Sequence, residues 1–428
     1  MNNSTNNVQR LGSIIATLLL LMPIVRYYNV PGTDIGSNSA ITLALFLLTP
    51  LAYLYNKRSI GIMDNRAVFR MSSIYFTCFM IWSVIITLYY EYGGLSSGNF
   101  NNAIVAFLSG FVMIMLLTGR IDVTKVFEKY EILVYIVLVI LAFQWVLTIA
   151  GMSMDFKLPF HSLNGSWIFD EGVVFGMNGT NTSIFSEPAH ISEFLVPYLC
   201  YMLFGENDIN KKRRKGLSII VSLAIVLTLS GTGIVLLGIV WMLYFTLLSD
   251  KRGANKVVIG VVGIIAVVAT FFVMQMFEDY NTMFGKLFFS SSGSLEENKS
   301  SFRIYRGWDY VFKMPSANLL TGVGFVHMET FARRNGIWSI FDNNFKMFEW
   351  FSGITEVILY FGIIGVVPFV AHIIKLYKKQ TKLTKSLIIV FCSLLFTSQV
   401  LFLETHFFYL LMIIGAIQTR RSIKMSQC

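Results

Sequence analysis

The stretch "EILVYIVLVILAFQWVLTIA", from Glu131 to Ala150, carries one ionisable residue at its first position and is otherwise almost entirely apolar. An α-helix needs about 20 apolar residues to cross a hydrocarbon core roughly 30 Å thick. Similar runs recur along the chain, and 55% of its 428 residues are hydrophobic while only 14% are charged. This composition excludes an ordinary soluble globule and predicts an all-α polytopic membrane protein.

The apolar runs predict about twelve membrane-spanning helices, which form a single transmembrane domain over residues 1–428. They lie at residues 11–28, 38–56, 71–91, 101–119, 130–151, 187–204, 217–230, 232–248, 256–276, 351–374, 385–403 and 406–419. The seventh and eighth runs are short and are joined only by "LSGTG" (Leu229 to Gly233). A tilted hairpin or a re-entrant pair is therefore an alternative interpretation of these two.

The basic residues predict which connections face the cytoplasm, because cytoplasmic loops of membrane proteins carry an excess of Lys and Arg. Alternate connections, together with the two ends of the chain, hold 24 of the 34 Lys and Arg residues. Both termini are therefore expected in the cytoplasm. The net charge of +10 is then a signal of orientation and not of nucleic-acid binding. We expect no metal and no cofactor, because no Cys/His cluster has metal-ligand spacing and no nucleotide-binding loop is present.

Two long connections are expected on the outer, periplasmic face, at about residues 152–186 and 277–350. Loops of this length in a compact protein are usually functional or disordered. The second loop carries Trp308, Trp338 and Trp350 together with many Phe residues. We therefore expect most of it to fold against the membrane domain as a cap.

Within this predicted cap, Arg303, Arg306 and Tyr310 recur at helical spacing and share one face, while Phe302, Tyr305 and Phe312 are expected to bury another. Pro315 is expected to stop this helix. Bidentate guanidinium groups suit phosphates and diphosphates. The pattern favours a diphosphate site at Arg303 and Arg306. The alternative is that both arginines pair with nearby carboxylates as solvated helix charges.

A second group of candidates opens the sixth predicted span, in "FSEPAHISEFL" (Phe185 to Leu195). Glu187 precedes Pro188, which is a favoured first helical residue, and His190 and Glu193 follow at helical spacing. Ionisable groups at the start of a membrane helix are functional candidates, and Glu187 or His190 could take a proton from a sugar hydroxyl. The alternative is that Ser186 or Glu187 caps the helix.

Weaker candidates lie elsewhere. Arg26 ends the first span beside two tyrosines and is more often an interfacial anchor than a ligand. Arg333 and Arg334 are expected either to support the anion site or to lie at its rim. Glu404 and His406 occupy a tight outer turn. They are expected either to line a substrate pathway or to be solvated.

The order of these motifs resembles the bacterial O-antigen polymerase (Wzy-type) family, within the superfamily of O-antigen ligases and polymerases. In that family an E-P-S/A element opens a span after an outer loop, as in "SEPAH" (Ser186 to His190). A T-x-S helix follows, as in "LTLSGTGIVLL" (Leu227 to Leu237). The large outer loop then carries an Arg, a Pro and G-V-G, which Arg303, Pro315 and Gly322 to Gly324 match in order. The resemblance covers most of the chain.

The chain also departs from the ligase-like members of the superfamily. Those members often carry an Arg directly after the Ser of the T-x-S helix, whereas this chain has Gly231 after Ser230. They also tend to carry a His in the region that here reads "FDNNFKMFEWFSG" (Phe341 to Gly353), which has none. These departures argue against a ligase.

The resemblance implies a metal-independent glycosyltransferase of the bacterial inner membrane whose active site faces the periplasm. It would transfer the growing glycan from undecaprenyl pyrophosphate to a new lipid-linked repeat unit, so that both donor and acceptor are lipid-linked oligosaccharides. Membrane lipids, a chain-length regulator and a flippase are the further expected partners. The alternatives are an O-antigen ligase, a flippase or transporter of lipid-linked saccharides, and a structural scaffold.

The charge distribution makes a direct prediction about topology. Reporters fused after Gly165 or Ser294 should behave as periplasmic, and reporters fused after Lys212 or Lys379 as cytoplasmic. Paired alkaline phosphatase and green fluorescent protein fusions measure this. A cytoplasmic reporter at Ser294 would place Arg303 on the wrong face and contradict the expected mechanism.

Overall fold

The computed structural model describes residues 2–26, 28–30, 32–33, 35–55, 73–82, 84–85, 98–118, 120–150, 173–174, 177–178, 181–185, 187–205, 211–228, 230–248, 299–324, 328–339, 351–378, 380–398 and 404–427. This part of the chain is helical apart from one antiparallel pair of short strands, β1 (Val173–Val174) and β2 (Met177–Asn178). The all-α prediction is confirmed for these residues.

The helices of the described part are α1 (Asn2–Val25), α2 (Ser37–Tyr55), a helix over Ser73–Trp82, α4 (Gly98–Leu117), α5 (Val126–Ile149), α6 (Pro188–Phe204), α7 (Lys211–Leu227), α8 (Gly231–Leu248), α11 (Lys299–Lys313), α12 (Ser316–Thr321), α13 (Met328–Asn335), α14 (Gly353–Tyr377), α15 (Lys382–Thr397) and α16 (Glu404–Gln427). They fall on every predicted span except 256–276, which lies outside the described residues. The predicted outer loops are described only in part, at the two strands, residues 181–185 and α11 to α13.

Among the described residues, three helices are long and apolar enough to cross a membrane: Ser37–Leu54, Val126–Ile149 and Gly353–Tyr377. Shorter apolar helices cover Arg10–Val25, Ser73–Trp82, Phe107–Leu117 and Gly231–Thr246. Helix α5 shows the expected pattern of a membrane helix, because the large apolar side chains on one face are exposed: Ile132, Ile136, Val139, Phe143 and Val146. Such a stripe is suited to lipid and not to water.

Helix α6 lies at the centre of the packing, and every residue from Ile191 to Met202 is buried. It packs against α7, α8 and α15. Aromatic rings join it to the neighbouring helices, since Tyr130 of α5, Phe194 of α6 and Phe408 of α16 lie with ring centroids 5.1 to 5.4 Å apart. Aromatic contacts at this spacing stabilise a core beyond the area that they bury. The first turn of α6 is thereby held in a fixed place.

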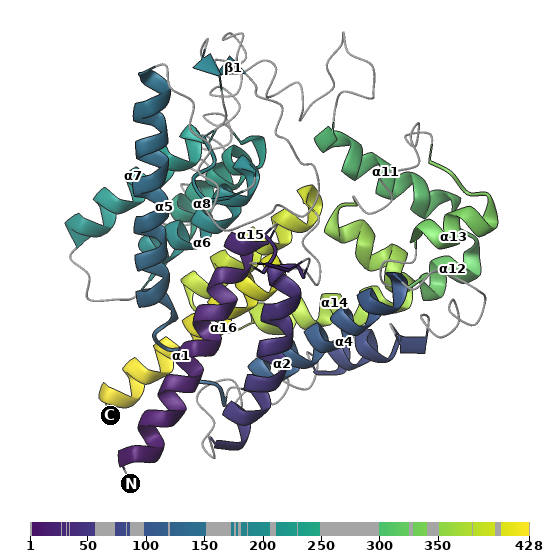
Figure 1. Cartoon of the computed structure of the whole chain (residues 1–428), viewed down its shortest axis with the longest axis horizontal. Coiled ribbons are helices and arrows are strands. Elements are labelled where there is room, and N and C mark those ends of the chain that lie inside the picture. Colours follow the sequence, from purple (N-terminus) through teal and green to yellow (C-terminus); the bar gives the residue numbers. More distant parts are fainter. Residues whose placement is uncertain are drawn as a thin grey trace.

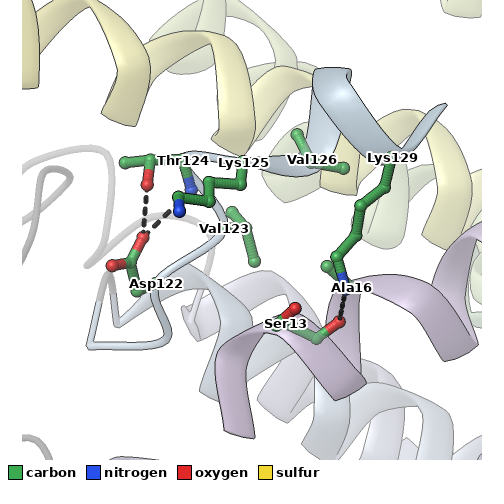
Figure 2. A pocket seen from close by; sticks show the side chains of 8 residues that line it. All are labelled: Ser13, Ala16, Asp122, Val123, Thr124, Lys125, Val126 and Lys129. Atoms are coloured by element: carbon green, nitrogen blue, oxygen red, sulfur yellow. Dashed lines mark hydrogen bonds between the residues drawn. The ribbon is translucent and has the colours of Figure 1, made fainter. Parts of the chain in front are cut away.

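Hydrogen bonds join the start of α5 and the segment before it to the middle of α1 and to α16. Both chain ends lie on the same side of the molecule (Figure 1). Lys129 donates to the Ser13 carbonyl and to the Thr17 hydroxyl, each at 2.7 Å. Gln418 of α16 bridges the amide of Val123 and the carbonyl of Ile121, each at 2.9 Å. The groups around Lys129 line a cavity of about 30 Å³ (Figure 2).

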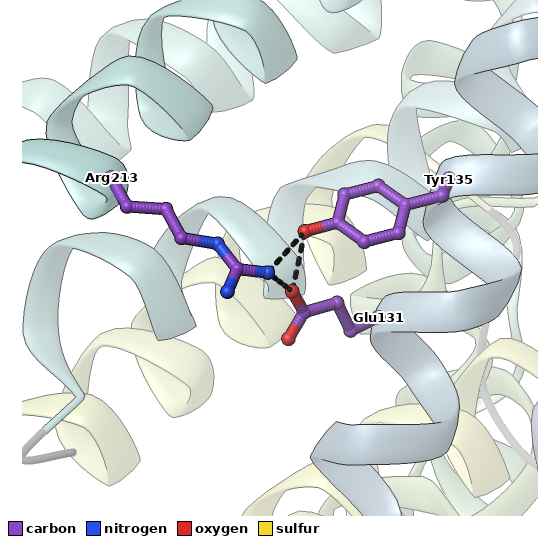
Figure 3. Close-up of polar contacts among 3 residues, drawn as sticks. All are labelled: Glu131, Tyr135 and Arg213. Carbon is purple, nitrogen blue, oxygen red and sulfur yellow. Dashed lines mark hydrogen bonds and ion pairs between the residues drawn. The ribbon is translucent and has the colours of Figure 1, made fainter. Parts of the chain in front are cut away.

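The basic run before α7 is helical, so α7 begins six residues earlier than the predicted span at 217–230. Arg214 explains this, because it donates to the carbonyls of Met202 and Gly205 at 2.9 and 2.6 Å and so caps the end of α6. Arg213 pairs with Glu131 at 3.0 Å and also donates to Tyr135 (Figure 3). These contacts tie α7 to both α5 and α6.

The "T-x-S" element was expected to be helical, and this expectation is wrong at the motif itself. Thr228 and Ser230 lie in the turn between α7 and α8, and both are buried. The Ser230 hydroxyl accepts from the amide of Gly233, as an N-cap does. Thr228 lies 3.0 Å from the hydroxyl of Ser192 in α6. The T-x-S turn therefore contacts the helix that the E-P-S/A element opens.

Helix α14 was predicted as one span but is broken at Gly362, whose φ of 64° lies in the left-handed region. The break frees the carbonyls of Leu359 and Tyr360, which accept hydrogen bonds from the amides of Val323 and Gly324 at 2.8 and 2.9 Å. The "GVG" segment thus fills the break.

The break at Gly362 predicts that replacing this glycine lowers the free energy of unfolding. Gly362→Ala should destabilise the protein by at least about 1 to 3 kcal/mol, the usual cost of a non-glycine residue in such a conformation. Overlap adds to this cost, because a Cβ there would meet the carbonyl of Leu320. Chemical unfolding in mixed micelles measures the change.

Gly216→Ala is the matched control, because that glycine is helical and its Cβ would meet open space. It should be neutral or slightly stabilising. Equal effects at the two positions would contradict the role assigned to the break.

Candidate functional site

A partly buried cluster of ionisable side chains joins α1, α6 and α16 at the end opposite to Lys129. Arg26 directly follows α1, His190 lies in the first turn of α6, and Glu404 is the first residue of α16. The Arg26 Nε lies 2.7 Å from the Glu404 Oε1, and their side chains are only 16% and 9% exposed. The Arg26 Nη1 lies 3.4 Å from the His190 Nε2. A charged pair and an imidazole therefore meet among apolar helices.

A small cavity adjoins this cluster. It measures about 10 Å³ and is lined by Pro23, Arg26, His190, Glu193, Phe194, Thr405 and Phe408. Glu193 is buried, and its carboxylate accepts from the Thr405 hydroxyl at 3.4 Å. A cavity of this size has room for about one water molecule or one hydroxyl group, and Arg26, His190 and Glu193 line it together with apolar side chains. The arrangement can thus place one oxygen atom between an imidazole, a carboxylate and a guanidinium.

The segment before α6 is fixed by side chains of other elements. Gln144 of α5 donates to the Ser183 carbonyl and accepts from its amide, at 3.1 and 2.7 Å. The Tyr28 hydroxyl donates to the Ile184 carbonyl at 3.2 Å. Pro188 then occupies the first helical turn with a preset φ. His190 is therefore presented by a rigid entry and not by a free loop.

Glu187 occupies the N-cap position of α6 in an extended conformation, and its side chain makes no capping hydrogen bond. Its backbone carbonyl accepts from the amide of His190 at 3.1 Å. The side chain is half-buried. Glu187 therefore occupies the cap position, but its carboxylate does not cap the helix. Ser186, the other predicted cap, lies outside the described residues.

The predicted diphosphate residues lie on α11, which packs on α14 and α15. The side chain of Arg303 lies outside the described residues. Arg306 is fully buried, with its guanidinium carbon 5.5 Å from the centre of the Phe351 ring. Tyr310 is also fully buried and meets the same ring edge to face at 5.8 Å.

The expectation that Tyr305 and Phe312 bury the other face of this helix is wrong. Tyr305 is 43% exposed and Phe312 is 81% exposed. The reason is that Gly307 permits close contact with Thr355 of α14, where a Cβ would overlap its side chain, so the face of Arg306 and Tyr310 turns inward. Pro315 separates α11 from α12, as predicted.

The remaining candidates are placed as follows. Arg333 and Arg334 lie in the last turn of α13 and are exposed. Interpreting Glu404 and His406 as solvated is wrong, because both are buried. The structure thus brings His190 together with Arg26, a weaker candidate, and with Glu404, whose pairing with Arg26 the sequence did not reveal. One available signal was that both charges border apolar runs.

Among the described residues, no group of three or more His, Cys, Asp or Glu side chains is placed to hold a metal ion. No protein-family model matches the chain, and no curated protein sequence matches it significantly. Function is therefore inferred from residue chemistry and geometry.

The cluster predicts a measurable coupling between Arg26 and Glu404. Each of Arg26→Gln and Glu404→Gln should destabilise the protein, because each leaves a partly buried charge without its partner. In a double-mutant cycle the pair should couple by about 1 to 3 kcal/mol. Chemical unfolding in mixed micelles provides the four free energies.

The control cycle uses Arg213→Gln and Glu131→Gln, because that pair has the same chemistry but Arg213 is 60% exposed. Its coupling should be much smaller, since solvent screens an exposed pair. Equal coupling in the two cycles would show that the Arg26 pair is an ordinary surface contact.

Proposed function

We propose that the chain is a membrane glycosyltransferase that polymerises lipid-linked saccharide repeat units at the periplasmic face of a bacterial inner membrane. The observation that carries the proposal is the cluster of Arg26, His190, Glu193 and Glu404 beside a small cavity. Ionisable groups among apolar helices are costly, so they are retained where they serve a function. The motif order that resembles O-antigen polymerases gives the reaction class.

In this reaction an acceptor hydroxyl attacks the first carbon of the donor saccharide, and the lipid diphosphate leaves. Arg26 can only donate hydrogen bonds, so its contact with the His190 Nε2 requires a neutral imidazole protonated at Nδ1. The same Nε2 is the only atom of this tautomer that can accept the proton of the hydroxyl, so the acceptor hydroxyl must displace the Arg26 Nη1 from it when the substrate binds. Glu187, at the start of the same helix, is the second candidate for this role.

The leaving diphosphate needs a cation that is in place before the bond breaks. Arg26 adjoins His190. Arg306 instead lies on α11 and packs against the Phe351 ring. We therefore assign the diphosphate contact first to Arg26, which Glu404 holds in position, and keep Arg303 as the candidate contributed by α11. Arg306 and Tyr310 support the packing of α11 on α14 in this arrangement.

The proposed topology has twelve spans with both termini in the cytoplasm. The contacts support it, because they join chain segments that this topology places on the same side. Arg26, His190 and Glu404 would all be periplasmic, whereas Ser13, Lys129 and Gln418 would all be cytoplasmic. A chain-length regulator and a flippase are the expected protein partners of such an enzyme.

A transporter of lipid-linked saccharides is the second candidate, and one observation favours it. Transporters commonly use broken helices and ionisable residues deep in the bundle. Helix α14 is broken at Gly362, and Glu356, His372 and His406 are buried. An O-antigen ligase is a third candidate and would need lipid A core as its acceptor.

Reconstitution distinguishes these functions. Purified protein supplied only with undecaprenyl-diphosphate-linked repeat units should form a ladder of longer glycans and release one undecaprenyl diphosphate per linkage. His190→Ala should lower the rate by about a hundredfold or more, because the proton acceptor is lost. Gel analysis of the glycans and chromatography of the released lipid measure both.

Arg213→Gln is the control variant, since Arg213 lies at the opposite end of the bundle, and it should retain the rate. Movement of unmodified saccharide across the vesicle would indicate a transporter instead. Transfer that occurs only after addition of lipid A core would indicate a ligase. Either result would overturn the polymerase proposal.

A further inference from the structure

Helix α11 has two faces of opposite character. The face that packs on α14 buries Arg306, Gly307 and Tyr310, while the other face exposes Tyr305 and Phe312. Phe312 is the most exposed of the large hydrophobic side chains in the described part of the chain, at 81%. Exposing a large aromatic side chain such as that of Phe312 to water is unfavourable, so this face favours an apolar environment.

The exposed apolar surface continues from α14 onto α12. Leu320 of α12 is 48% exposed, and its backbone carbonyl lies directly against Gly362 at the break in α14. Immediately beyond the break, α14 exposes Ile363, Ile364 and Val367. Because α14 is one of the helices apolar enough to cross a membrane, Leu320 borders a surface that would face lipid.

Basic side chains accompany this surface. Lys313 ends α11, where it pairs with Asp309 and donates to the Trp338 carbonyl, each at 2.9 Å. Arg333 and Arg334 end α13, where both are exposed. The aromatic residues, the aliphatic residue and the basic residues together match the composition of helices that lie at the boundary between headgroups and acyl chains. Their positive charge complements the phosphates of anionic phospholipids.

We propose that the face formed by Tyr305, Phe312 and Leu320, here called the interface face, contacts the bilayer, with Tyr305 and Phe312 at the level of the headgroups and Leu320 deeper, beside the break in α14. Arg333 and Arg334 reach the phospholipid phosphates from α13. Segment α11 to α13 is then anchored beside α14 and does not extend freely into the aqueous phase. The proposal requires only that α14 cross the bilayer, and it does not depend on the reaction that the protein catalyses.

Photo-crosslinking tests this placement. The photoreactive residue p-benzoylphenylalanine is introduced at position 312 of the full chain, which is then reconstituted in vesicles of phosphatidylethanolamine and phosphatidylglycerol. It replaces an exposed aromatic side chain by another, so folding should be preserved. After irradiation, mass spectrometry should detect a shift equal to one phospholipid on the peptide that contains position 312. Position 305 provides an independent second site.

Two control positions give the crosslinking yields expected for a side chain in lipid and for one in water. Position 139, on the exposed apolar stripe of α5, should give the phospholipid adduct in comparable yield, and position 215, an exposed lysine near the start of α7, should give almost none. A protein adduct at 312 in place of the lipid adduct would show that another polypeptide or a second copy covers the face. The absence of any lipid adduct at 312 and 305, with a normal yield at 139, would place the face in water. Both results would overturn the proposal.

Discussion

The backbone hydrogen bonds at the break in α14 are the constraint that joins the predicted cap to the rest of the chain. A helix that is interrupted in apolar surroundings leaves carbonyl groups that must find donors within the protein. Val323 and Gly324 supply these donors to Leu359 and Tyr360, and the indole of Trp82 donates to Tyr360 as well, at 3.2 Å. The order of α11, α12 and the "GVG" segment beside α14 follows from this need.

Charged side chains among apolar helices also need partners within the protein, because little water reaches them. At one end of the bundle, Arg26 is held by Glu404 beside His190, while Lys129 at the other end satisfies its amine with Ser13 and Thr17. The hydrogen bonds of Lys129 join α5 to α1. Both ends adjoin a small cavity, but the cavity at Arg26 is lined by the His190 imidazole and the Glu193 carboxylate, whereas the described residues that line the one at Lys129 include no histidine. This difference makes the Arg26 end the better candidate for chemistry.

Much of the helical fold could be predicted from the sequence, because apolar runs of sufficient length have few other uses. The site could be predicted only in part. His190 was identified by its place at the start of a span, but the pairing of Arg26 with Glu404 joins distant segments and leaves no local pattern. Helical spacing placed Arg306 and Tyr310 on one face of α11, yet it could not show which face is buried. Aromatic residues do not decide this, because they suit a protein core and a lipid surface equally.

The central claim is that the substrate reacts at the Arg26 end of the bundle. A cryo-EM structure with a lipid-linked saccharide whose diphosphate is replaced by a non-cleavable methylene diphosphonate tests it most directly. The account predicts phosphonate oxygens within about 3 Å of the Arg26 guanidinium and the saccharide next to His190. An analogue bound at the Lys129 end, or one that leaves Arg26, His190 and Glu404 without contact, would contradict the claim.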